Sequence, residues 1–185
     1  MAEANSKQLN STVIAGSIRG KKLVNPEKIT RPLTNRIKQS LFDLIRDFID
    51  GAEVLDLYAG GGNFGIEALS RGAESATFVD IALQSQKAVE KNLEDHPEFE
   101  YEFHKQNVQD YIRLTDREFD LIMLDPPFDD VRITYIKDAA KLLKSNGLLI
   151  FRHPEQYESP ENLHHLKRTH EERYGKSTLS FYQNT

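Results

Sequence analysis

The chain contains no cysteine. It can therefore form no disulfide framework, no zinc site built from thiolates and no iron–sulfur cluster held by cysteine. It also lacks an apolar run long enough to cross a bilayer, and its first ten residues are polar, without the hydrophobic stretch of a signal peptide. We therefore expect no membrane association, and the cytoplasm is the expected location.

Flexible linkers are missing as well. The 185 residues contain no internal repeat, no low-complexity tract and no Gly/Ser-rich segment. The composition, 38% hydrophobic and 29% charged, is typical of a globular protein, and the length suits one domain with a sizeable core. We predict a flexible leader over residues 1–10 and a single domain over residues 11–185, in which residues 11–33 form an N-terminal extension.

Positive charge is scarce overall but concentrated near one end. The formal net charge is −5, yet residues 1–50 hold nine Lys and Arg against five Asp and Glu, and residues 16–40 hold seven basic residues and one acidic residue. A local basic patch of this kind can bind phosphate groups even on an acidic protein. A solvated face with no partner fits the same pattern equally well, so charge alone leaves nucleic-acid binding open.

Strands and helices alternate after residue 51. Short apolar segments typical of buried strands are separated by segments with helical periodicity. The expected strands are 54–58, 75–80, 100–104, 120–125 and 147–151, and the expected helices are 64–71, 83–93, a short one from 108, and 133–143. This alternation predicts a parallel sheet with right-handed crossovers, followed by an antiparallel pair over 166–173 and 177–182.

The segment before residue 51 follows another pattern. Two β-prone pieces, 12–16 and 20–24, are expected to form a hairpin. Thr34 is the expected cap of a helix whose apolar residues fall on one face. The predicted fold class is therefore an open α/β sandwich with a short N-terminal β-hairpin extension.

A glycine-rich loop follows the first strand of the alternating region. Gly60, Gly62 and Gly65 form G-x-G-x-x-G between an expected strand and an expected helix, where a ligand can approach the main chain closely. Asp80 ends the next strand, 20 residues after Gly60, where a carboxylate can accept both hydroxyls of a ribose. The spacing predicts a nucleotide-like cofactor and leaves NAD and S-adenosylmethionine both open.

The charge of this loop favours one of the two cofactors. Asp56 lies inside the strand, and no basic residue stands in the loop. Such a site suits a cationic sulfonium and ammonium better than a pyrophosphate, which indicates S-adenosylmethionine. The alternative interpretation is a tight turn with an incidental surface aspartate.

The fourth strand runs into Asp125-Pro126-Pro127-Phe128. Each proline holds the preceding residue extended and brings no N–H group. The Asp125 carboxylate and the Pro126 carbonyl can then both accept hydrogens from one exocyclic NH2 group, and Phe128 offers a face on which a base stacks, worth about 1–3 kcal/mol. The alternative is a plain turn that leaves a strand.

This motif predicts methyl transfer to an amino group. The methyl donor is already activated as a sulfonium, so catalysis is chiefly positioning and electrostatics. The absence of cysteine excludes methylation of pyrimidine C5 by the usual covalent route, and radical methylation with it.

The residues of these motifs resemble those of the RsmD-like guanine-N2 methyltransferases of bacterial small-subunit ribosomal RNA, and the resemblance covers nearly the whole chain. The segments that carry it are 13–16, 19–23, 30–36, 40–42, 55–60, 65–72 and 125–128. The resemblance implies a Rossmann-like class I methyltransferase sandwich, with a mostly parallel seven-stranded sheet and a C-terminal antiparallel strand. It also implies methylation of the N2 amine of a guanine in 16S ribosomal RNA, within a partly or fully assembled small subunit. We expect the protein to act as a monomer.

Carried over residue by residue, the resemblance implies three groups of functional residues. The target guanine is held by Asp125, Pro126, Pro127 and Phe128. The cofactor is held by Asp56, Tyr58, Ala59, Gly60, Gly62, Asn63, Gly65 and Asp80, with Asn107 and the backbone of Val108 against its adenine ring. RNA docks on Arg19, Lys21, Lys22, Arg31 and Arg36.

The chain departs from the family's pattern at three places. Gly61 stands where the family usually has serine, and Asn35 stands where it usually has aspartate. The segment between Lys22 and Arg31 is short.

Other functions remain open on sequence alone. The Asp-Pro-Pro-Phe motif by itself also fits DNA adenine-N6 methyltransferases and protein glutamine methyltransferases. A non-catalytic protein that holds RNA or a nucleotide on the same fold is a rival of another class, and an NAD-dependent oxidoreductase is a fourth reading. The histidines, among them His164, His165 and His170, show no ligand spacing with a carboxylate, so no metal site is predicted.

Overall fold

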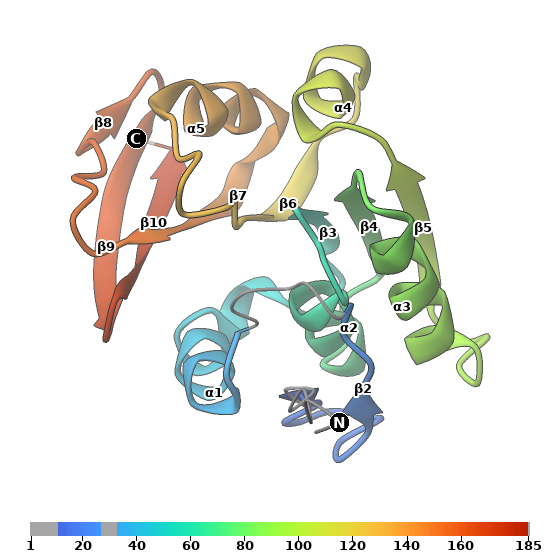
Figure 1. Cartoon of the computed structure of the whole chain (residues 1–185). Coiled ribbons are helices and arrows are strands. Elements are labelled where there is room, and N and C mark those ends of the chain that lie inside the picture. The colour runs from blue at the N-terminus through green and yellow to red at the C-terminus, as the bar shows by residue number, and fades with distance from the viewer. Residues whose placement is uncertain (1–10, 27–32, 185) are drawn as a thin grey trace, which may run out of the picture.

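The computed structural model describes residues 11–26 and 33–184 (Figure 1). Within them, eight strands form one sheet, and a two-stranded hairpin stands apart from it. The strands of the sheet are β3 (Glu53–Leu57), β4 (Ser75–Asp80), β5 (Glu100–Lys105), β6 (Phe119–Leu124), β7 (Leu143–Pro154), β8 (Asn162–Leu163), β9 (Leu166–Tyr174) and β10 (Ser177–Asn184), and those of the hairpin are β1 (Ser11–Thr12) and β2 (Lys22–Leu23). The helices are α1 (Asn35–Leu44), η1 (Arg46–Phe48), α2 (Asn63–Ser70), α3 (Leu83–Leu93), α4 (Val108–Leu114), α5 (Ile133–Ala139) and η2 (Ala140–Leu142). The predicted leader over residues 1–10 lies outside the described residues.

The strand order is β5-β4-β3-β6-β7-β10-β9-β8. Strands β3 to β7 are parallel, and β10 lies antiparallel between β7 and β9. The order reverses between β3 and β6, and ligands of such sheets bind beyond the carboxyl ends of the strands at that point. The predicted α/β sandwich and its N-terminal hairpin are confirmed. The expected seven strands are eight in the described residues, because the two-residue strand β8 is added at the edge, and β8, β9 and β10 pair antiparallel.

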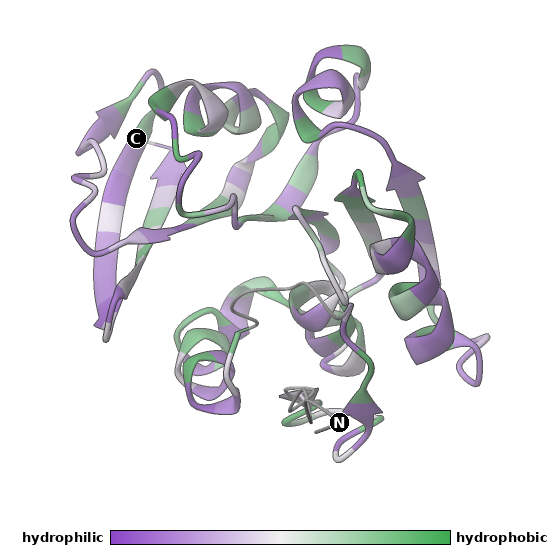
Figure 2. Cartoon of the chain, viewed as in Figure 1, coloured by the Kyte–Doolittle hydropathy of each residue, from purple (hydrophilic) through white to green (hydrophobic). Residues whose placement is uncertain are grey.

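Strand β7 is longer than the sequence predicts. It was expected over 147–151 but extends to Pro154 because β10 pairs with it from Leu149 onward. The extension carries Arg152 and His153, two polar residues that the apolar pattern did not include. Figure 2 shows that β9, on the other side of β10, is mostly hydrophilic.

The side chains of the central strands alternate between two cores, as the two-residue period of a strand requires. In β6, Leu121 and Met123 belong to one cluster, and Ile122 and Leu124 belong to the other. Helices α1, α2 and α3 cover the first face of the sheet, and α4 and α5 cover the second (Figure 1). Because both faces are covered, β6 is almost continuously apolar.

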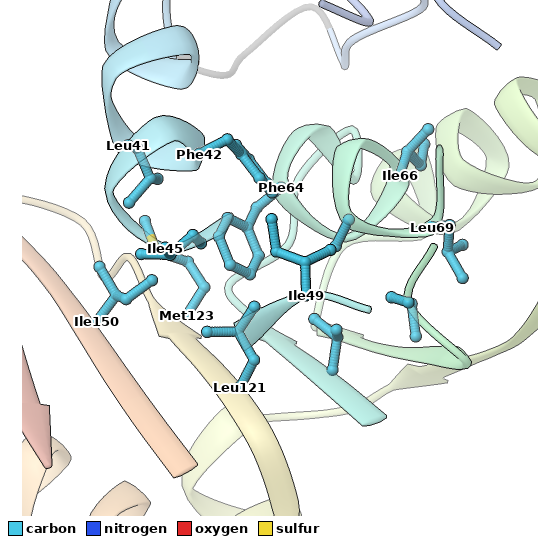
Figure 3. Packing of buried hydrophobic residues seen from close by; sticks show 14 of the residues in the cluster. Leu41, Phe42, Ile45, Ile49, Phe64, Ile66, Leu69, Leu121, Met123 and Ile150 are labelled. Carbon is cyan, nitrogen blue, oxygen red and sulfur yellow. The ribbon is translucent and has the colours of Figure 1, made fainter. Parts of the chain in front are cut away.

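Helices α1 and α2 pack together on the first face (Figure 3). The rings of Phe42 and Phe64 are tilted, with 5.2 Å between their centroids, above Met123 of β6. Helix α1 begins where the sequence predicts, since Thr34 caps it by accepting the Ile37 N–H at 3.4 Å.

The N-terminal extension docks on α2. The buried Glu67 carboxylate accepts the backbone N–H groups of Ile14 at 2.9 Å and Ala15 at 3.1 Å. A Cβ on Gly16 would lie 1.7 Å from the Ser70 carbonyl oxygen, so only glycine allows this approach. The hairpin is therefore fixed to the helix that follows the glycine-rich loop.

One basic residue of the segment 16–40, Lys38, does not lie on the surface. Its side chain is fully buried, and its ammonium donates to Glu67 at 3.2 Å and to the Thr12 carbonyl at 2.7 Å. Burial lowers its pKa, and the neighbouring Glu67 opposes the shift. One of the seven basic residues counted over 16–40 therefore belongs to the core and contributes nothing to a phosphate-binding surface.

Over the described ranges, no helix combines the length and the apolar character needed to cross a membrane.

Candidate active site

A cavity of about 600 Å³ opens at the carboxyl ends of β3, β4, β6 and β7. This volume falls in the range of small-molecule sites. Its wall brings together three carboxylates from three strand ends, Asp56, Asp80 and Asp125, and the guanidinium of Arg152. The two motifs that the sequence analysis singled out, 65 residues apart at Gly60 and Asp125, therefore share one cavity.

Asp56 supports the helix that leaves the glycine-rich loop. Gly62 is the N-cap of α2 and has no side chain to cap it. The buried Asp56 Oδ2 accepts the Gly65 N–H at 3.0 Å and so satisfies one of the free donors at the helix start. Burial raises the Asp56 pKa well above its ordinary value, and the hydrogen bond from Gly65 opposes that shift.

Two glycines of the loop are needed for their backbone conformation, and two others because a side chain would clash with a neighbour. Gly60 and Gly62 have φ of +54° and +75°. A Cβ on Gly65 would stand 2.4 Å from the Phe78 ring, and one on Gly61 would stand 2.4 Å from Asn25 Oδ1. Gly61 thus departs from the family's serine at a point where the extension occupies the space.

Asp80 closes the loop from the neighbouring strand. Its Oδ2 accepts the Gly60 N–H at 2.9 Å, and its Oδ1 accepts the Ala82 N–H at 2.9 Å. Asp80 faces the cavity together with Ile81, a residue that is 69% exposed. The predicted place of Asp80, beside the glycine-rich loop at the end of β4, agrees with the structure.

The extension is clamped to the loop by residues that sequence reasoning missed. The Asn92 amide on α3 accepts the Val24 N–H at 2.8 Å and donates to the carbonyls of Val24 and Gly61, both at 3.0 Å. Asn25 Oδ1 accepts from Asn63 Nδ2 at 2.6 Å. The one available signal was a polar residue on the apolar face of the expected helix 83–93.

Arg152 is the second residue that was missed. The pairing of Leu124 with Phe151 sets the residues after them, Asp125 and Arg152, side by side. Arg152 Nη1 donates to Asp125 Oδ2 at 2.9 Å, and the two side chains are 5% and 23% exposed. The loop lacks a basic residue, as the sequence shows, but a neighbouring strand supplies one to the cavity.

The electrostatics of Asp125 follow from this pair. Burial raises the pKa of Asp125, and the charge and hydrogen bond of Arg152 hold it down. Pro126, Pro127 and Phe128 follow Asp125 along the cavity wall.

The remaining predicted cofactor residues divide between the wall and its support. Tyr58, Ala59, Gly60 and Asn63 line the cavity. Tyr58 holds a positive φ of 63°, and burial raises its pKa to about 12. Gly62 and Gly65 lie behind the wall, packed against Phe78.

Asn107 and Val108 are not brought to the cavity wall as the structure describes it. Asn107 caps α4 by accepting the Gln109 N–H at 2.8 Å, and Val108 is buried against the second face of the sheet. Their predicted contact with an adenine ring stays a prediction. Leu33, just before α1, does line the cavity and was not predicted.

The predicted RNA-docking residues lie on the extension and on α1. Arg19 and Lys22 are exposed on the hairpin, and Arg36 is exposed in the first turn of α1. Lys21 is partly buried, with 4.0 Å between its ammonium and Asp95. Arg31 lies outside the described residues.

Comparison with known proteins identifies the family. The model of the family described as Conserved hypothetical protein 95 matches residues 11–183. The chain is 32% identical over 180 residues to the protein YlbH of Bacillus subtilis, a match that covers 92% of this chain and 97% of YlbH. It is 34% identical over 143 residues to the ribosomal RNA small subunit methyltransferase D of Haemophilus influenzae, covering 74% and 72%. The chain belongs to this family, the RsmD family.

A solved structure supports the same conclusion. The Escherichia coli protein yhhF superposes with a TM-score of 0.85 at 25% identity, over 95% of this chain and 98% of that one. Membership of the RsmD family confirms the resemblance seen in the sequence, and the shared architecture confirms the class I methyltransferase fold.

Proposed function

We propose that this RsmD-family protein transfers a methyl group to the exocyclic N2 amine of a guanine in 16S ribosomal RNA. The coarser statement, an RNA methyltransferase of this family, follows from the match over residues 11–183 and from the relatives named for ribosomal RNA methylation. The observation that carries the finer proposal is the position of Asp125 and Pro126 in the same cavity as the glycine-rich loop and Asp80.

The methyl donor is S-adenosylmethionine, and the family confirms this prediction from the sequence. When bound, it supplies a methyl group already activated on a sulfonium. The residues present fit such a cation, because Asp56 and Asp80 face the cavity. Asn63 Oδ1 also fits, since this buried acceptor in the cavity wall receives no hydrogen bond from the described residues.

Each of these groups has a role in our proposal. Asp80 accepts the hydroxyls of the ribose, and the apolar side chain of Ile81 offers a surface to the adenine. Asn63 Oδ1 and Asp56 accept from the ammonium of the amino-acid end. A buried acceptor left without a donor costs about 1–3 kcal/mol, so Asn63 has reason to favour a ligand that donates to it.

The target amine is held by Asp125 and Pro126. The Asp125 carboxylate and the Pro126 carbonyl accept the two N2 hydrogens, which turns the nitrogen lone pair out of conjugation with the ring. As the nitrogen forms its bond to the methyl group, it gains positive charge, and the Asp125 carboxylate stabilises that charge. Asp125 is then also an acceptor for the proton that the methylated nitrogen loses.

RNA is the substrate that suits this arrangement. The guanine must leave its stack to reach the cavity, and loops of RNA expose bases at low cost. Phe128 in the wall offers a stacking face, and Arg19, Lys22 and Arg36 offer exposed positive charge. Action on an assembling small subunit in the cytoplasm, as a monomer, remains part of the proposal.

Methyl transfer to competing substrates tests the proposal. Labelled S-adenosylmethionine is supplied with small ribosomal subunits from a strain lacking this protein, with naked 16S ribosomal RNA, with DNA or with protein. We expect label in ribosomal RNA. Label in DNA adenine or in a protein glutamine would keep the methyltransferase and overturn the substrate. RNA binding without any transfer would favour a non-catalytic role.

A further inference from the structure

Arg152 is buried at a place where the fold does not require a charge. It follows the apolar run from Leu148 to Phe151 on β7, in the middle of the sheet. Burying a guanidinium carries a desolvation cost that an apolar side chain of similar volume avoids. Its position against the cavity therefore calls for a functional reason.

We propose that Arg152 is a positioning residue of the active site, whose single guanidinium fixes both the carboxylate of Asp125 and the ring of Phe128 that meet the target base. The inference rests on the proposed function, because the two residues that it positions are those assigned to the target amine and base.

The geometry supports this role on three sides of the guanidinium. Nη1 donates to Asp125 Oδ2 at 2.9 Å. Nε donates to Ser177 Oγ of β10 at 3.3 Å, which anchors the arginine on the antiparallel strand behind it. Cζ lies 5.3 Å from the centroid of the Phe128 ring, within the range of a cation–π contact. One side chain thus ties β6, its loop and β10 together.

The other titratable groups around Asp125 are negative or neutral, so Arg152 is needed to offset their charge. The other titratable groups in the cavity wall are Asp56 and Tyr58 from the β3 end, Asp80 from the β4 end and Asp129 from the same loop. None of these carries positive charge, so in the described wall Arg152 is what offsets the carboxylates. Burial raises the pKa of Asp125, and Arg152 lowers it.

Loss of Arg152 would therefore favour the protonated form of Asp125. A protonated carboxyl is a weaker acceptor for the target amine and does not oppose the positive charge that develops on the nitrogen. The ring of Phe128 would also lose its cationic neighbour. Both changes act on the chemical step more than on cofactor binding.

Two variants separate charge from shape. In Arg152→Gln we expect kcat to fall on the order of 100-fold at neutral pH, as for a misplaced reacting group, while KM for S-adenosylmethionine changes little. The acid limb of the kcat profile should move to higher pH. Arg152→Lys keeps the charge without the planar fork, so it should restore the acid limb but only part of kcat.

Arg71 provides a matched control. It makes the same pair of contacts away from the cavity, donating to Glu67 at 2.8 Å and lying 4.8 Å from the centroid of Phe42. Arg71→Gln should lower thermal stability and leave the pH profile of kcat unchanged. An equal pH shift in Arg71→Gln would show that the effect is structural and would overturn the role of Arg152.

A titration of the Asp125 side-chain carboxyl by NMR tests the inference without activity. We expect the pKa of Asp125 to be higher in Arg152→Gln than in the wild type and close to the wild-type value in Arg152→Lys. An unchanged Asp125 titration together with an unchanged kcat profile would refute the inference. If the pKa rises but the wild type methylates no RNA, the proposed function fails and the Arg152–Asp125 coupling stands. If Arg152→Gln does not fold, the test uses Arg152→Lys alone. A kcat below that of the wild type supports the inference, and an unchanged kcat refutes it.

Discussion

Asp56 on β3 caps the helix that begins seven residues later, at Asn63, because its Oδ2 accepts the Gly65 N–H at 3.0 Å. The helix could not be capped locally, since Gly62 at its N-cap has no side chain. The glycine that opens the loop to a ligand therefore removes the local cap, and the strand carboxylate replaces it. The carboxylate that we assign to the cofactor ammonium is in this way also part of the fold.

Asp56→Ala should destabilise the protein and weaken the cofactor site together. Loss of a cap costs about 0.5–2 kcal/mol, and the affinity for S-adenosylhomocysteine should fall as well. Urea unfolding and isothermal titration calorimetry measure the two effects. Full affinity in Asp56→Ala would contradict our assignment of Asp56 to the cofactor.

The stability of the protein should depend on the ionisation of Asp56. Because burial raises its folded pKa well above the unfolded value, its contribution is present below the unfolded pKa of about 4 and is lost as pH rises through the folded pKa. The side chain of Asp56→Asn is neutral at every pH. The free energy of unfolding of this variant should therefore rise relative to that of the wild type as pH increases over this interval. Urea unfolding at a series of pH values checks this. A difference that stays constant with pH would speak against a raised pKa.

Asn92→Ala should loosen the extension from the cofactor loop. The change removes the donor and acceptor that Val24 and Gly61 use, which should cost about 1–3 kcal/mol and raise the Kd for S-adenosylhomocysteine. Hydrogen exchange should speed up at Val24. Gln86→Ala, which removes an exposed hydrogen bond to Glu90 on the same helix, is the control. It should leave the Kd for S-adenosylhomocysteine and the hydrogen exchange at Val24 unchanged.

Gly65→Ala should be destabilising because of space. Its Cβ would meet the Phe78 ring at 2.4 Å, and overpacking of this kind costs about 1–3 kcal/mol. Adding Phe78→Leu should recover part of the loss, as thermal unfolding of the single and double variants can show. Equal stability of Gly65→Ala and the wild type would contradict this prediction and would mean that the Phe78 ring can move aside at little cost.

Lys22→Gln tests the extension as an RNA-docking surface. Lys22 is exposed on the hairpin, and neutralising one phosphate contact should weaken RNA binding and reduce the slope of log K against log salt by about 1. Lys141→Gln removes an exposed charge on η2, over the second face of the sheet, and should leave the slope unchanged. The same slope for wild type and Lys22→Gln would remove this residue from the interface.

The sequence predicted the parts of the site that depend on local pattern. Asp80 ends β4, the glycine-rich loop and Asp125 come just after β3 and β6, and parallel strands bring their carboxyl ends to one edge of the sheet. The order of strands along the chain therefore already brings these residues to one edge of the sheet, where the structure places them in one cavity.

The parts that depend on distant pairing could not be predicted in this way. Arg152 reaches Asp125 through the register of β7 on β6, and Asn92 reaches Val24 across 68 residues of sequence. Lys38 looked like surface charge because its buried partner, Glu67, lies 29 residues away. In each case the partner is set by tertiary packing, which periodicity and spacing do not encode.

The central claim is that Asp125 holds the N2 amine of a guanine in 16S ribosomal RNA during methyl transfer. The most direct test supplies labelled S-adenosylmethionine and small subunits lacking the modification to the wild type, to Asp125→Ala, and to the control Asp138→Asn, followed by nucleoside analysis. Asp138 lies on α5 outside the cavity wall, where it pairs with Lys141. We predict labelled N2-methylguanosine with the wild type and the control, and a loss on the order of 100-fold or more with Asp125→Ala. A different labelled nucleoside, or undiminished N2-methylguanosine from Asp125→Ala, would contradict the claim.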